Sequence, residues 1–239
     1  MTVHWAQVII AGVWGGLCAL ERRAFLQAMF SRPLVAATGM GLLLDDLPAG
    51  LYVGMVLELY FLGAASLGAA KPANDTLAAT CASAAAACLA TNNGADSTPA
   101  IWSLCILGFV LMGDVGRFLD RRLERHSTNL AGKALASADA GNLNRAVRQN
   151  LWGMWPHFLV FGGLTALCAL IGFLAAPFER MLPRDLLRGF AWAYPAIASV
   201  AAAIAVRGSH ARRGGLFAGI AAAVVAVGSV LGLRMEGGQ

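Results

Sequence analysis

Charged residues are scarce in this 239-residue sequence, because Asp, Glu, Lys and Arg together make up only 13% of it. A soluble globular domain usually carries about 25% charged residues. Hydrophobic residues make up 58% of the chain, and the mean hydropathy is +0.65. This composition argues against a soluble enzyme, a disordered segment or a coiled coil. It predicts an all-α integral membrane protein, a multi-span helical bundle.

Lysine is rarer still, with 2 lysines against 16 arginines and a net charge of +5. The arginines lie mostly between apolar runs, which is typical of residues that set membrane orientation rather than of a nucleic-acid-binding face. We therefore expect the basic segments 117–150 and 207–213 to face the cytoplasm, and the acidic turn 91–99 to face outward.

Motifs of soluble catalysis are missing. The five cysteines form no C-x-x-C pair and lie in apolar runs, which is typical of buried free thiols. The four histidines are far apart in the sequence, and no P-loop, catalytic triad or HExxH motif occurs. We therefore expect no catalytic residue, no metal site and no cofactor.

Apolar runs divide the chain into membrane segments. Five runs approach or exceed the roughly 20 residues that a spanning helix needs: Val3–Leu20, Ala49–Ala70, Leu151–Pro177, Gly189–Val206 and Gly214–Leu233. A helix from Ile101 to Met112 is expected to continue into Asp114–Arg117. Two further runs are too short to cross alone, which predicts short, re-entrant or broken helices around residues 33–44 and 66–90.

The whole chain, 1–239, is expected to form a single polytopic membrane domain. The only long polar stretch within it, 117–150, holds seven basic residues against three acids. Its Ala- and Leu-rich spacing predicts helical segments that are broken near Gly141-Asn142, within an otherwise basic cytoplasmic loop.

Glu58 is the strongest sign of a polar site, because a carboxylate in the middle of an apolar helix costs about 2.5–3.5 kcal/mol on insertion scales. It suits a hydrogen-bond acceptor for a polar solute, or else a structural partner of an arginine. A second polar group surrounds Pro72, which interrupts a regular helix. The candidate substrate-binding residues are Glu58, Ser66, Lys71, Asn74, Asp75, Gln27 and Glu21. A solvated turn at residues 66–75 and an interfacial loop at residues 21–27 are the alternatives.

The order of several short motifs resembles a known family. The segment Phe25–Ala36 is followed by Gly41, Leu44-Asp45, Gly50, Gly54 and Glu58-Leu59, then by Leu67–Ala70, Pro72, Asp75 and Leu77-Ala78. Gly113, Arg117, Asn129, Ala138, Gly141 and Asn142 continue the match. The sequence is similar to the IIC membrane subunit of the mannose/sorbose family of the phosphoenolpyruvate-dependent sugar phosphotransferase system.

The resemblance implies a sugar-translocating permease subunit in the bacterial inner membrane, which imports a hexose or related sugar as it is phosphorylated. It implies a IID membrane partner, cytoplasmic IIB and IIA phosphocarriers, a trimer of IIC–IID heterodimers and an elevator-like movement. No phosphorylated residue is expected on IIC itself. Docking of IIB is then expected at the basic stretch, through Arg117, Arg121, Arg122 and Arg125; simple positive-inside topology is the other interpretation.

Two other functions stay open at the level of sequence. An ion-coupled secondary transporter or channel would use Glu58 and Asp75 as protonation or cation sites. A non-transporting membrane scaffold or sensor would engage only the cytoplasmic IIB protein through residues 117–150. The sugar is not identified by the sequence.

Overall fold

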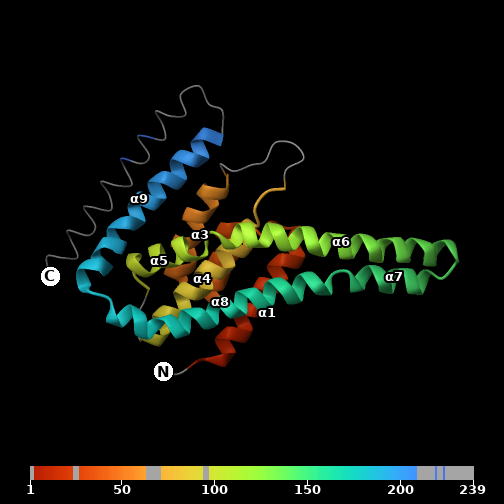
Figure 1. Ribbon diagram of the computed structural model, residues 1–239, viewed down its shortest axis with the longest axis horizontal. Coiled ribbons are helices and arrows are strands. Elements are labelled where there is room, and N and C mark those ends of the chain that lie inside the picture. The colour runs from red at the N-terminus through yellow and green to blue at the C-terminus, as the bar shows by residue number, and fades with distance from the viewer. Residues whose placement is uncertain are drawn as a thin grey trace.

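The computed structural model describes residues 3–23, 27–62, 71–93 and 97–208, together with residues 219 and 223. Every element in this part of the chain is an α-helix, which confirms the predicted fold class (Figure 1). The helices are α1 (Trp5–Arg23), α2 (Pro33–Leu43), α3 (Leu47–Leu62), α4 (Asp75–Asn93), α5 (Pro99–Phe109), α6 (Met112–Asp139), α7 (Leu143–Trp152), α8 (Trp155–Met181) and α9 (Arg184–Gly208). The predicted run Gly214–Leu233 lies outside the described residues, apart from positions 219 and 223.

Helices α2 and α3 form a short antiparallel hairpin. They have 11 and 16 residues, hence lengths of about 17 and 24 Å at 1.5 Å per residue, below the roughly 30 Å of a hydrocarbon core. The chain reverses at Asp45, which has a φ of 60°. Asp46 then begins α3, because its carboxylate accepts the Ala49 N–H at 3.0 Å. The short helix expected at residues 33–44 is confirmed.

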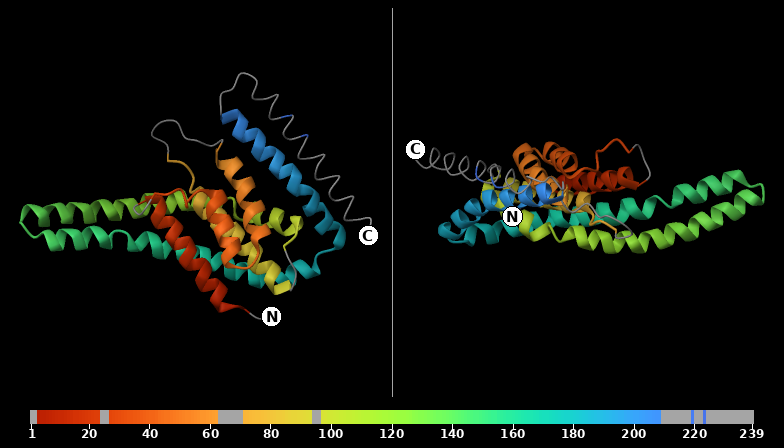
Figure 2. Two further views of the ribbon diagram at one scale, coloured as in Figure 1. Left: turned by 180° about the vertical axis from the view of Figure 1, so that it is seen from behind. Right: turned by 90° about the horizontal axis from the view of Figure 1, so that it is seen from above.

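Helix α4 lies at the centre of the bundle and packs against α1, α2, α3, α5, α6 and α8 (Figure 2). Residues 76–90 are all buried. Most of them are Ala, Ser, Thr or Cys, and such small side chains allow several helices to approach one axis closely. The break expected around residues 66–90 falls before Asp75, and the helix is continuous from there to Asn93.

Glycines make the closest helix contacts possible. Helix α1 meets α8 where Gly12 faces Gly162, and α8 meets α4 where Gly172 faces the backbone of Ala85. A Cβ atom at Gly172 would lie 2.9 Å from the Cα of Ala85. A larger residue there would push α8 away from the central helix.

We expect Gly172→Ala to lower the stability of the chain by about 1–3 kcal/mol, the usual cost of overpacking a core. Gly163→Ala, in the same helix, is the matched control, because nothing lies within 4 Å of its added Cβ. That control should be neutral or stabilise α8 by up to about 1 kcal/mol through helix propensity. Thermal unfolding in detergent measures both, and equal melting temperatures for the two variants would contradict this packing.

Helices α6 and α7 form a long antiparallel hairpin that projects from the other helices (Figures 1 and 2). The predicted break near Gly141-Asn142 is confirmed, since α6 ends at Asp139 and Asn142 caps α7 by accepting the Arg145 N–H at 3.2 Å. The continuous helix expected from Ile101 to Arg117 is interrupted instead. A turn at Val110–Leu111 separates α5 from α6, although the residues there are as apolar as those around them.

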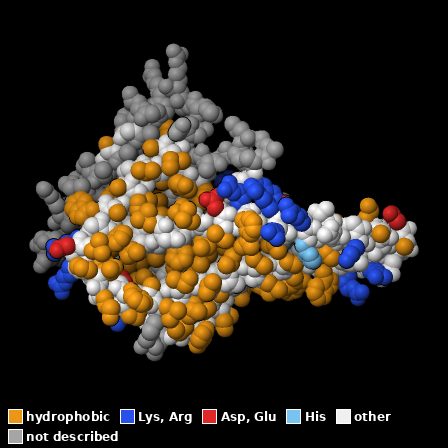
Figure 3. Space-filling model, viewed as in Figure 1, with side chains coloured by type: hydrophobic (Ala, Val, Ile, Leu, Met, Phe, Trp, Pro, Cys, Tyr) orange, Lys and Arg blue, Asp and Glu red, His pale blue; other side chains and the backbone are white. Residues whose placement is uncertain are grey.

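The described residues contain three helical stretches that are long and apolar enough to cross a membrane: Pro99–Asp139, Leu143–Met181 and Arg184–Val206. Large hydrophobic side chains are exposed on α1, α2, α3, α8 and α9, and Figure 3 shows hydrophobic side chains over much of the face seen in that view. All five cysteines are buried and free, as the sequence predicts. The molecule is a membrane protein.

Candidate functional site

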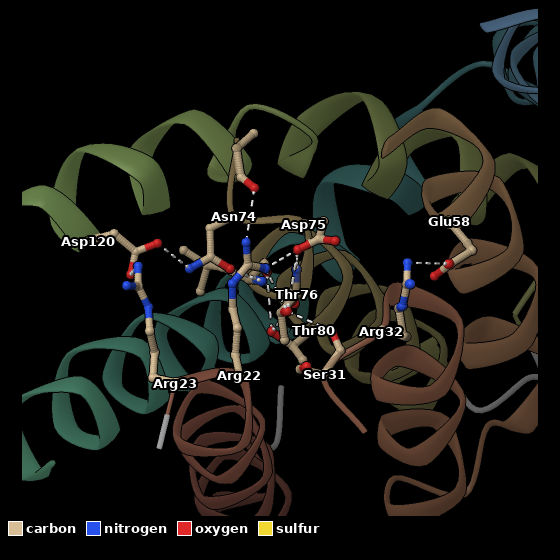
Figure 4. A network of polar contacts seen from close by, with 12 residues as sticks. Arg22, Arg23, Ser31, Arg32, Glu58, Asn74, Asp75, Thr76, Thr80 and Asp120 are labelled. Atoms are coloured by element: carbon tan, nitrogen blue, oxygen red, sulfur yellow. Dashed lines mark hydrogen bonds and ion pairs between the residues drawn. The ribbon is translucent and has the colours of Figure 1, made fainter. Parts of the chain in front are cut away.

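A group of polar contacts, in three sets, involves the end of α1, the segment 27–32, the start of α2, Glu58 of α3, the segment 71–74, the start of α4 and the middle of α6 (Figure 4). We call it the polar belt. The chain reverses direction after α1, and both Gln27 and Met29 have left-handed backbone angles, with φ of 49° and 68°. Non-glycine residues in this conformation often mark functional segments. Pro33 then begins α2, where its fixed φ suits the first helical position.

Arg22 lies at the centre of the belt. Its guanidinium forms an ion pair with Asp75. It also donates hydrogen bonds to the Thr76 hydroxyl at 3.0 Å and to the Ala73 carbonyl at 3.3 Å. The side chains of Arg22 and Asp75 are 21% and 25% exposed, so this ion pair is accessible to a solute.

Glu21 and Ser31 fix the segment between α1 and α2. The carboxylate of Glu21 is buried and accepts the Ser31 N–H at 2.8 Å. The Ser31 carbonyl in turn accepts the Thr76 hydroxyl at 2.6 Å. Glu21 therefore holds this segment against the start of α4.

Glu58 faces the start of α2. Its carboxylate oxygens lie 3.5 Å from an Arg32 guanidinium nitrogen and 3.3 Å from the Leu34 N–H. A carboxylate at a helix N-terminus is stabilised by the free N–H groups and by the helix dipole. Both contacts are long and the Glu58 side chain is 22% exposed, so this group retains acceptor capacity for a further donor.

The belt continues from α4 to α6. The Asn74 amide donates to Asp120 at 3.1 Å, while its oxygen accepts the Leu77 N–H at 3.0 Å and caps α4. Arg23 forms ion pairs with Asp120, at 2.9 Å, and with Glu124.

Lys71 completes the belt through an ion pair with Glu124. Burial, and after it the positive charge of Arg23, lowers the pKa of Lys71 below its ordinary value. The Lys71 ammonium thus depends on its acidic neighbours for stabilisation.

Five of the seven predicted substrate-binding residues lie in the polar belt: Glu21, Glu58, Lys71, Asn74 and Asp75. Gln27 lies on the segment 27–32 between α1 and α2, but its side chain is exposed. The contacts of this segment with Thr76 and Glu58 are made by Ser31 and Arg32 instead. Ser66 lies outside the described residues. Sequence reasoning missed Arg22, Ser31 and Thr76 as members of this site.

The predicted docking arginines lie on α6. Arg121, Arg122 and Arg125 are exposed, and Figure 3 shows blue side chains gathered over this helix. Arg122 lies over the ring of Phe118, at 5.1 Å, and Arg117 pairs with Asp114 at 2.7 Å. In the described part of the chain no carboxylate pairs with Arg121, Arg122 or Arg125, because Asp120 and Glu124 point to Arg23 and Lys71. These three arginines form what we call the basic face of α6.

The belt offers carboxylate oxygens, guanidinium and amide N–H groups and hydroxyls within one region. Such mixed donors and acceptors suit a solute that both donates and accepts hydrogen bonds, as hydroxyl groups do. The charged members strengthen those bonds, since a bond to a charged group contributes about 1.5–3 kcal/mol.

Comparison with known proteins places this chain in a family. The profile of the family described as the sorbose-specific IIC component of the phosphotransferase system matches residues 5–208. A sorbose-specific EIIC component from Lacticaseibacillus casei is 32% identical over 80 residues, which are 34% of this chain. The matched part spans only 28% of the length of that relative.

Two solved structures share the fold. A structure described as a membrane protein has a TM-score of 0.68 at 21% identity, covering 98% of this chain and 95% of the other. The mannose transporter ManYZ in complex with microcin E492 has a TM-score of 0.54 at 23% identity, covering 99% of this chain and 95% of the other. The family match covers most of the chain and confirms the resemblance found in the sequence: this protein belongs to the family of sorbose-specific IIC components of the phosphotransferase system.

Proposed function

We propose that the chain is the sugar-translocating IIC subunit of a mannose/sorbose-type phosphotransferase system, and that the polar belt binds the sugar. The observation that carries this proposal is the partly exposed ion pair of Arg22 on α1 with Asp75 on α4, together with the partly exposed Glu58 carboxylate of α3 at the start of α2. In a chain so poor in charge, such a concentration of ionisable groups is typical of a solute pathway.

The sugar is a hexose or a related monosaccharide, and it becomes phosphorylated as it enters. Asp75 and Glu58 accept hydrogen bonds from its hydroxyls, and Arg22 orients Asp75. Lys71 and Asn74 line the same region, and Ser66 and Gln27 remain proposed contacts of the sugar. Family membership supports this function over an ion-coupled transporter or a non-transporting scaffold.

The protein is a multi-pass protein of the bacterial inner membrane and functions with a IID membrane subunit, in a trimer of IIC–IID heterodimers. The ManYZ neighbour supports such a partner. Cytoplasmic IIA and IIB proteins supply the phosphate.

Uptake by cells tests the translocation proposal. Cells that express this chain with IIA, IIB and IID proteins of the same family should accumulate phosphorylated L-sorbose or D-mannose. Cells that express the same proteins without this chain should not. Equal accumulation in both would contradict the proposal.

The basic face of α6 is proposed to dock the phosphorylated IIB protein. Phosphohistidine is anionic, and arginine clusters steer such partners at rates that fall as salt rises. Reversal of Arg121, Arg122 and Arg125 to Glu should slow sugar phosphorylation at low salt by about tenfold or more, the scale of electrostatic steering. Sugar binding should persist, because these exposed side chains form no ion pair with the described residues of the polar belt.

The matched control is reversal of Arg184 and Arg188, which are exposed near the start of α9, at the end of α8 opposite to the α6–α7 hairpin (Figure 1). This variant should phosphorylate sugar at the rate of the unmodified protein. If the α6 variant also phosphorylates sugar at the rate of the unmodified protein, the arginines of α6 do not dock IIB. Their role is then only to set the orientation of the chain in the membrane.

A further inference from the structure

A polar cavity of about 240 Å³, open on one side, lies beside the polar belt at the base of the α6–α7 hairpin. The end of α1, α6, the end of α7 and the start of α8 line it. Its polar lining residues are Arg23, Glu124, Ser127, Gln149, Asn150 and His157, and its remaining wall is apolar. Arg23 and Glu124 belong to both the belt and the cavity, so the two regions adjoin.

Two buried polar atoms at this cavity have no hydrogen-bond partner within the described residues. They are the Nε2 atom of His157 and the Nε atom of Arg23. The side chain of His157 is only 7% exposed, and the Gly153 backbone hydrogen-bonds to its imidazole. Because buried polar groups are almost always satisfied, the imidazole acceptor and the guanidinium donor need a partner that the described residues do not supply.

The charges around the cavity select against an anion. The two terminal nitrogens of Arg23 are already paired, one with Asp120 at 2.9 Å and the other with Glu124. Glu124 itself lines the cavity, and Lys71 is paired with it from the other side. A phosphate group would therefore meet a carboxylate and no available guanidinium fork, whereas neutral hydroxyls can use the amides of Gln149 and Asn150 and the Ser127 hydroxyl.

The size of the cavity sets the ligand class. An engineered apolar cavity of about 150 Å³ holds benzene. The larger cavity here can hold one six-membered ring with its hydroxyl groups. An apolar wall opposite a polar wall fits the two kinds of surface that a monosaccharide presents.

We propose that this cavity is a second binding site for the unphosphorylated monosaccharide, and that it rejects the sugar phosphate. The inference rests on the proposed function for the identity of the solute class. It adds a site next to the polar belt that binds the substrate and does not bind its phosphorylated product.

Cysteine protection tests the proposal in the full chain purified with its membrane partner. Ser127→Cys places a thiol in the cavity wall, and the five native cysteines are buried, so they react little with a maleimide. L-Sorbose or D-mannose at about ten times its Kd should slow the labelling by about tenfold, because only the unoccupied fraction reacts. The corresponding sugar phosphate should leave the rate unchanged.

Ala136→Cys is the matched control, because it is exposed on the same helix and does not line the cavity. Its labelling should not respond to either sugar. Adding His157→Leu to Ser127→Cys should remove the protection; if that variant fails to assemble, Ala131→Phe fills the cavity from an exposed position of α6 and should have the same effect.

Three outcomes overturn the inference: neither sugar protects residue 127, the sugar phosphate protects it equally, or residue 136 is protected to the same degree. A complex that transports sugar without protecting residue 127 refutes this second site alone. Protection in a complex that never transports would contradict the proposed function and leave the binding site standing.

Discussion

Sugar uptake should fall by at least about tenfold when Asp75 is replaced by Asn, since one lost charge-assisted hydrogen bond of about 1.5–3 kcal/mol corresponds to a tenfold change or more. The substitution keeps the shape of the side chain and removes its charge. Asp75 pairs with Arg22 in a partly exposed position, where a sugar hydroxyl can reach its second oxygen. Uptake in vesicles that contain the assembled complex measures the effect.

A double variant separates sugar binding from simple charge balance. If Asp75 only neutralises Arg22, then Arg22→Gln combined with Asp75→Asn should restore uptake. If Asp75 binds the sugar, the double variant should stay as impaired as Asp75→Asn. Asp114→Asn is the control for loss of an ordinary surface pair, because Asp114 pairs with Arg117 on an exposed part of α6, and it should transport normally.

Glu58→Gln should lower uptake by a similar factor, and for the same reason. The test again needs a partner variant, because Glu58 lies 3.5 Å from Arg32. Recovery of uptake in Arg32→Gln with Glu58→Gln would make this pair structural. If the Asp75 and Glu58 variants both assemble normally and transport at the unmodified rate, the sugar site lies elsewhere.

The second large effect concerns the partner. Expressed alone, the chain should fail to give a stable, transporting preparation, and co-expression with its IID-type partner should rescue both properties. The α6–α7 hairpin projects from the other helices (Figure 1), and α7 has no buried residue. Leu143 and Trp152 on α7 are 68% and 62% exposed, which is typical of a surface that another protein covers.

Size-exclusion profiles and thermal unfolding in detergent check this dependence. The partner should bind with the chain through purification and raise its melting temperature, because a ligand of the folded state stabilises it by mass action. Leu143→Ser combined with Trp152→Ser should weaken the association. A monodisperse, transporting preparation of the chain by itself would contradict the prediction.

The helices themselves could largely be predicted from hydropathy. Apolar runs and their polar ends determine α1, α8 and α9, and Pro33 together with Asp45-Asp46 sets the limits of the short α2. The turn at Val110–Leu111 could not be predicted, because its residues are as apolar as the helix around it. Nor could the pairing of α1 with α8, since contacts between Gly12 and Gly162 depend on tertiary packing and glycine is common throughout the chain.

Some residues of the candidate site could likewise be predicted from the sequence, and others could not. Glu58 and Asp75 stand out in sequence because a charge is conspicuous in an apolar run. Arg22 and Arg23 were interpreted as markers of membrane orientation, which is what arginines at a helix end usually are. Their role in the polar belt follows only from the folded chain, which brings α1 beside α4 and α6.

The numbers of basic and acidic residues in the stretch 117–150 correctly indicate that it is positively charged. They do not indicate which of these residues form ion pairs with one another. Asp120 and Glu124 appear in sequence to offset the arginines around them. In the structure these acids face Arg23 and Lys71, because residues three and four apart share one side of α6. In the described part of the chain Arg121, Arg122 and Arg125 therefore have no carboxylate partner that offsets their charge.

Phosphorylation-coupled uptake in a reconstituted system tests the central proposal most directly. Proteoliposomes would contain this chain and its IID-type partner, with the phosphocarrier proteins and phosphoenolpyruvate on one side and radiolabelled L-sorbose or D-mannose on the other. We predict that sugar phosphate appears on the phosphocarrier side only when this chain, the partner and phosphoenolpyruvate are all present, and that dissipating ion gradients has no effect. Transport that needs an ion gradient and ignores phosphoenolpyruvate, or sugar phosphate formed equally without this chain, would contradict the proposed function.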